Sequence, residues 1–165
     1  MHSSIFKPLL NILLSFSLSP LIAKSQDSTW DRYLPSHISS VISSLDKHKM
    51  KGEFTIAPGQ AAYRVDLPYL GKTRPITKST LEFIKIWGKT FGINADLNSI
   101  YTHEACFQYE SREIWFPIQS ELIPHLQNEF PNGGMIEIKI AWLGHISEEI
   151  VLVINGYGPA APSSK

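Results

Sequence analysis

The chain contains a single cysteine, Cys106, among its 165 residues. No intramolecular disulfide can form, so the hydrophobic core has to hold the fold without a covalent crosslink. We interpret Cys106 as a small buried apolar side chain. The alternatives are a reactive thiol and an intermolecular disulfide.

The sequence has no excess charge of either sign and no block of basic residues. It carries 15 lysines and arginines against 15 aspartates and glutamates. A nucleic-acid surface needs a concentrated positive field, and a polybasic membrane patch needs clustered lysines. We therefore expect no nucleic-acid partner.

Recognisable catalytic motifs are also missing. The sequence has no Gly-x-Ser-x-Gly elbow, no glycine-rich phosphate loop and no His-Glu-x-x-His. The nearest reactive cluster is His103-Glu104-Ala105-Cys106. On a strand, Glu104 and Cys106 would share one face while His103 points to the other, which leaves too few ligands for zinc. We predict no catalytic residue, no metal and no cofactor.

The one long apolar run lies at the N-terminus, and residues 1–25 are predicted to form a signal peptide. Lys7 precedes the run, and Ala23-Lys24-Ser25 is typical of a cleavage site. The run has about fifteen residues, fewer than the roughly twenty that cross a bilayer. We expect an exported protein, periplasmic or secreted, with no membrane span after signal removal. A retained anchor is the alternative.

The rest of the chain is predicted to contain one domain. Residues 26–50 form an N-terminal segment with a short amphipathic helix that Ser36 caps, residues 51–156 form an α+β domain, and residues 157–165 form a flexible tail. The first half of the domain is expected to contain a hairpin of residues 51–57 and 61–67 turning at Pro58-Gly59-Gln60, a loop between Pro68 and Pro75, and a helix over 80–89 with a capping box at Ser79. After a loop over 91–102, the second half is expected to contain strands at 104–109 and 113–118 and a helix from Ser120 that ends at 131–134. The last two strands are predicted at 136–142 and 150–154, joined by a turn at 144–147.

This order predicts an α+β fold with a mainly antiparallel sheet of about five to six strands and two to three helices. A helix before the last two strands is also how an OB-like small barrel is connected. The pattern permits such a barrel without selecting it.

Trp115 is the candidate binding residue. It alternates away from the apolar Ile114 and Phe116 and points to the face of Glu113. An exposed tryptophan on a sheet can receive a partner's side chain or stack on a sugar, although a helix could equally cover it. We expect a non-enzymatic protein that binds another macromolecule, most simply a protein, as an accessory, inhibitor or immunity-type module. The alternatives are a small-ligand or glycan binder using this aromatic face and an unrecognised hydrolase with dispersed residues.

Overall fold

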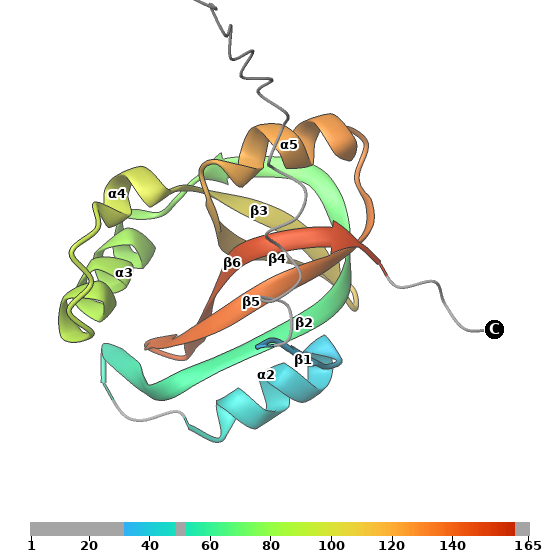
Figure 1. Cartoon of the computed structure of the whole chain (residues 1–165). Helices are drawn as coiled ribbons and strands as arrows, with labels where there is room; N and C mark the ends of the chain where they lie inside the picture. Colours follow the sequence, from blue (N-terminus) through green and yellow to red (C-terminus); the bar gives the residue numbers. More distant parts are fainter. Residues whose placement is uncertain (1–31, 49–51, 161–165) are drawn as a thin grey trace, which may run out of the picture.

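The computed structural model describes residues 32–48 and 52–160. The predicted signal peptide, residues 1–25, lies outside the described residues. The elements are β1 (Leu34–Pro35), α2 (Ile38–Asp46), β2 (Phe54–Pro75), α3 (Lys78–Thr90), α4 (Leu97–Ile100), β3 (Tyr101–Tyr109), β4 (Arg112–Gln119), α5 (Leu122–Glu129), β5 (Gly134–Ile146) and β6 (Glu149–Pro159) (Figure 1).

Five of the strands close into a barrel. Their order is β2-β3-β4-β6-β5, and β5 pairs with β2 to complete the circle. Every neighbouring pair in the barrel is antiparallel except β4 and β6, which are parallel. The short β1 lies parallel to β2 outside the barrel. The predicted α+β class is confirmed, and the described residues form four helices rather than two to three.

The predicted hairpin around Pro58 is wrong, because β2 is one strand of 22 residues. Its two halves both pair antiparallel with β5, and the register shifts between Ile56 and Ala61. Between the flanking pairs Ile56–Gly144 and Ala61–Trp142, four residues of β2 lie opposite the single residue Leu143 of β5. The proline therefore sits in a bulge, which absorbs its missing N–H and bends the strand around the barrel.

The expected loop between Pro68 and Pro75 is also strand. Tyr69 pairs with both Phe107 of β3 and Gly134 of β5, and Pro75 pairs with His103. Prolines are tolerated in a strand where the backbone is bulged or at its end. Pro75 lies at the end of β2, and Pro68 pairs only with Met135 of β5, because the pairing of β2 with β3 begins at Tyr69.

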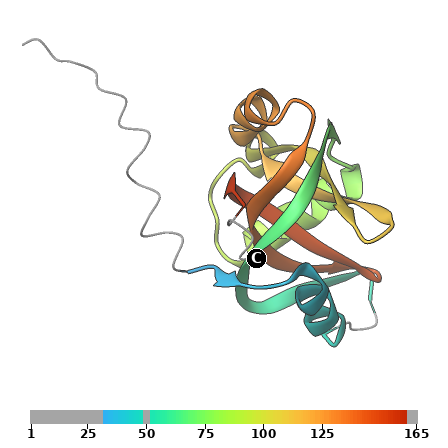
Figure 2. The ribbon, with the colours of Figure 1, turned by 90° about the vertical axis from the view of Figure 1, so that its right-hand side faces the viewer.

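The main core fills the barrel and reaches both of its ends. Side chains at every second residue of the strands point inward, as alternation requires. α5 and α2 lie at opposite ends of the barrel (Figures 1 and 2). The core joins Val65, Leu67, Phe107, Ile118, Ile138, Ile140, Trp142 and Ile154 from the strands with Leu126 of α5 and Ile38, Val41 and Leu45 of α2.

A second, smaller core lies outside the barrel wall. Phe83 and Ile84 of α3 are fully buried and belong to one cluster with Leu143 of β5 and Val151 and Val153 of β6. α3 thus covers the outer surface of the last two strands. The predicted helix over 80–89 is confirmed here.

Both predicted helix caps shift position. α3 begins at Lys78, and the hydroxyl of Thr77, not Ser79, accepts a hydrogen bond from the N–H of Thr80 at 3.2 Å. For α2 the N-cap is His37 rather than Ser36, and its side chain makes no capping bond. The chain position of each helix was predictable, whereas the choice among adjacent polar residues depends on how the preceding strand enters the helix.

The connections at the C-terminal end also differ from prediction. β5 continues to Ile146, so the last turn comprises Ser147 and Glu148. β6 continues to Pro159, and residues 157–159 of the predicted tail pair with β5. The predicted loop over 91–102 contains α4 and the start of β3. None of the helices in the described part of the chain is long and apolar enough to cross a membrane.

Candidate functional site

The barrel wall is open where β4 and β6 part. β4 pairs with β3 along its whole length, and β6 pairs with β5 along its own. Within the described residues, β4 and β6 pair with each other at one position only, where Ile118 lies opposite Ile154. N-terminal to that pair, residues 112–117 and 149–152 line a cavity of about 530 Å³, which we call the β4–β6 groove.

Local sequence explains why the pairing stops. Pro117 directly precedes Ile118 and has no N–H to give to a neighbouring strand. Ile42 and Asp46 of α2 also line the groove. α2 therefore borders the gap between the two strands at the end of the barrel that it covers.

The groove combines an apolar interior with charged surroundings. Ile114, Phe116, Ile150 and Leu152 alternate along its two strands. The described residues that line it include no histidine, cysteine or lysine. Its five carboxylates (Asp46, Glu104, Glu113, Glu148 and Glu149) outnumber its two arginines (Arg74 and Arg112).

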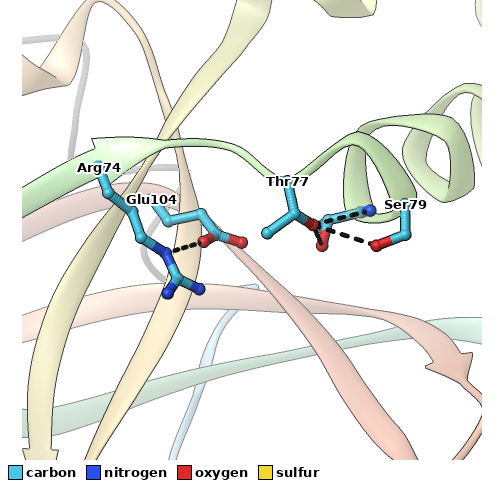
Figure 3. Close-up of polar contacts among 5 residues, drawn as sticks. Arg74, Thr77, Ser79 and Glu104 are labelled. Atoms are coloured by element: carbon cyan, nitrogen blue, oxygen red, sulfur yellow. Dashed lines mark hydrogen bonds and ion pairs between the residues drawn. The ribbon is translucent and has the colours of Figure 1, made fainter.

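At the rim of the groove, Arg74 of β2 contacts both Glu104 of β3 and the predicted binding residue, Trp115 of β4. Its Nε donates to the carboxylate of Glu104 at 2.6 Å, beside the first turn of α3 (Figure 3). Glu104 is buried, with 3% of its surface exposed. The guanidinium carbon of Arg74 lies 4.2 Å from the centre of the Trp115 ring. Breaking this cluster would leave a buried carboxylate without its cation, which is costly.

The structure places Trp115 in the lining of the groove, half-buried. Arg74 covers one face of its ring, so only part of the indole surface is open to a ligand. Sequence reasoning identified this residue from strand alternation. It missed Arg74, because Pro68 and Pro75 suggested a loop there, although the alternating Lys72 and Arg74 were a signal of a strand face.

Cys106 lies across the strand pair from Trp115 and is fully buried. Burial raises the pKa of its thiol to about 11, and the neighbouring Glu113 carboxylate adds to this effect. A reactive cysteine needs the opposite shift, toward the thiolate. These observations favour an inert, buried side chain over the reactive thiol.

Glu113 also forms the outermost ion pair of this face. Lys72 Nζ donates to its Oε1 at 2.5 Å. That hydrogen bond lowers the pKa of Glu113 and raises the pKa of Lys72. Both side chains are largely exposed, so solvent screens the pair and its stabilising effect is small.

The His103–Cys106 cluster does not converge on a common site. Glu104 contacts Arg74, and Nδ1 of His103 lies 2.9 Å from the hydroxyl of Thr102. No group of three or more His, Cys, Asp or Glu side chains within residues 32–48 and 52–160 is arranged to hold a metal ion.

The chain matches no protein-family model, and no curated protein matches it.

Proposed function

We propose that this chain is an exported, OB-like binding module that engages another protein through the β4–β6 groove. The strand order, the parallel contact between β4 and β6 and the helix before β5 support the OB-like assignment. In such barrels the second and third strands, with two neighbouring loops, form the ligand face. The equivalent strands here are β3 and β4, which carry Glu104 and Trp115.

The open barrel wall is the observation that carries this proposal. The same cavity is lined by consecutive residues of two strands, 112–117, which include Trp115, and 149–152. An apolar concavity with a polar rim is the usual form of a binding site. Tryptophan and arginine at its edge are the residue types that contribute most to protein interfaces.

A protein partner is better supported than a glycan. A sugar would stack on an open indole face, but the guanidinium of Arg74 already lies over the Trp115 ring. Repulsion from the excess of carboxylates also disfavours an acidic polymer. A polypeptide can use the apolar strand residues and the backbone of the groove together.

Site-specific photocrosslinking tests the proposal. A photoreactive amino acid is placed at Glu113 or Glu149, on the two sides of the groove, and at Asn132 as an exposed control outside the lining. The protein is expressed in its source cells, irradiated, and recovered from the exported fraction. We expect the same protein adduct from both groove positions and none from Asn132.

Two variants then connect the adduct to the proposed surface. Trp115→Ala should reduce the adduct at Glu149, because it removes an aromatic contact of the groove. Phe91→Ala removes an aromatic residue that is 44% exposed and lies outside the lining, so it should leave the adduct unchanged. Adducts that form equally from Asn132, or that ignore Trp115→Ala, would reject this surface.

A further inference from the structure

We infer that the occupant of the β4–β6 groove is an extended, basic peptide segment that pairs as an added strand with the open edge of β4. This inference rests on the proposed function and specifies its partner. The argument combines three features of the groove: a strand edge without a neighbour, alternating apolar walls, and free carboxylates at one end.

The backbone of β4 supplies the first feature. Residues 112–117 pair with β3 on one side only, and no register pair with β6 is formed by them in the described chain. Alternate residues of an antiparallel strand direct their N–H and C=O groups away from the paired neighbour. Those groups face the groove, and an open strand edge is a template for another extended chain.

The length of this edge sets the length of the ligand. Six residues of β4 border the groove, and a strand rises about 3.3 Å per residue, which makes the edge about 20 Å long. A segment of about six residues in extended conformation can therefore pair with it.

Side chains of the groove predict an alternating ligand. Phe116 and Leu152 are buried members of the barrel core, and Ile42, Ile114 and Ile150 pack against that core. All of them also line the groove, so the apolar atoms that they expose there can contact a bound peptide. Every second side chain of the added strand would enter this apolar interior, and the others would point outward toward Trp115.

Glu148 of the β5–β6 turn and Glu149, the first residue of β6, supply the charge. Glu148 and Glu149 are exposed, and neither takes part in an ion pair with another described residue. By contrast, Glu104 and Glu113 already have Arg74 and Lys72 as partners. A lysine or arginine at one end of the peptide would meet two carboxylates that have no cation of their own.

Selection from a random octapeptide library tests this inference. The protein is produced from its complete coding sequence, and enriched octapeptides are synthesised for affinity measurement. We expect enrichment of sequences that contain lysine or arginine, lack proline and alternate with apolar residues. Two N-methylated versions of a selected peptide are then compared, one methylated at its odd-numbered residues and one at its even-numbered residues. One of the two should bind at least tenfold more weakly, because methylation removes the backbone N–H donors that pair with β4.

Charge reversal at the turn tests the basic specificity. Glu148→Lys and Glu149→Lys should each weaken the selected basic peptide about tenfold, which corresponds to about 1.4 kcal/mol. Glu82→Lys on α3 is the matched control, since Glu82 is exposed and lies outside the groove lining. Far-ultraviolet circular dichroism and the melting temperature verify that each variant is folded.

Amide exchange localises the bound peptide. Exchange in the segment 112–117 should slow on peptide addition, and that in α3 should not change. Failure to enrich any peptide, tolerance of N-methylation in both registers, or equal binding by Glu149→Lys would overturn the inference. Crosslinking from Glu113 and Glu149 to a protein would then still support the proposed function, so the two failures can be told apart.

Discussion

We expect the buried Lys139 to make the free energy of unfolding of this protein rise with pH in the alkaline range. It lies on β5 between Arg64 of β2 and Gly156 of β6, and 5% of its surface is exposed. Its ammonium nitrogen is 5.8 Å from the centre of the Tyr33 ring. Burial lowers the pKa of Lys139 from 10.5 to about 8, with a smaller opposing effect from Glu137.

The sign of the effect follows from proton counting. Between pH 8 and 10.5 the unfolded chain holds a proton on Lys139 that the folded protein has released. Unfolding then takes up a proton, so raising the pH increases the free energy of unfolding. A limiting slope of about 1.4 kcal/mol per pH unit gives a gain of about 2 kcal/mol between pH 8 and 10.

Urea unfolding followed by circular dichroism from pH 7 to pH 10, at constant ionic strength, measures this gain. The range stops at pH 10 because the pKa of Tyr157 is raised to about 12, which favours unfolding at higher pH. Lys139→Met should abolish the rise, because methionine carries no titratable proton. The exposed Lys85→Met serves as control. A flat wild-type profile, or a rise that persists in Lys139→Met, would refute the reasoning.

Three further predictions concern the core and the thiol. The hydroxyl of Tyr69 is buried without a hydrogen-bond partner in the described structure, so Tyr69→Phe should raise the free energy of unfolding by about 1 kcal/mol, measured by urea titration; a loss of stability would show that the hydroxyl is satisfied. Gly144 has φ +141°, and a Cβ there would lie 1.9 Å from the carbonyl oxygen of Thr55, so Gly144→Ala should cost about 3 kcal/mol in the same assay, whereas a neutral effect would contradict the close strand contact. Cys106 is buried and its pKa is raised to about 11; a thiol reagent at pH 8 should therefore label it only as fast as the protein unfolds, and rapid labelling of the folded state would restore the reactive-thiol interpretation.

Local alternation was sufficient to predict β3, β4 and β5, because inward and outward side chains differ sharply there. Ile136, Ile138 and Ile140 are all fully buried, as their spacing predicted. β2 could not be predicted in the same way. Pro58 and Gly59 are typical of a turn, and only the pairing of both flanking segments with β5 makes them a bulge. Such pairing is a tertiary property that a local pattern does not contain.

The candidate site was predictable in one residue and hidden in the rest. Trp115 stands out because its direction on β4 follows from alternation. Arg74 was assigned to a loop. Glu148 belongs to a turn whose position was predicted too early, and Glu149 is the first residue of β6 rather than part of the loop before it. The groove itself arises where two strands that are distant in sequence diverge after Ile118 and Ile154. No pattern within either strand specifies that divergence.

The net charge of the whole chain was not sufficient to predict which class of partner the groove favours. The whole chain has equal numbers of acidic and basic side chains, which argues against polyanionic partners but favours no other class. The fold distributes these charges unevenly, with five carboxylates and two arginines around one groove. A ligand within that groove experiences the local field, because water at physiological ionic strength screens charges more than about 8 Å away. The basic ligand that we propose is therefore inferred from the local charges: folding pairs Glu104 with Arg74 and Glu113 with Lys72, whereas Glu148 and Glu149 form no ion pair with another described residue.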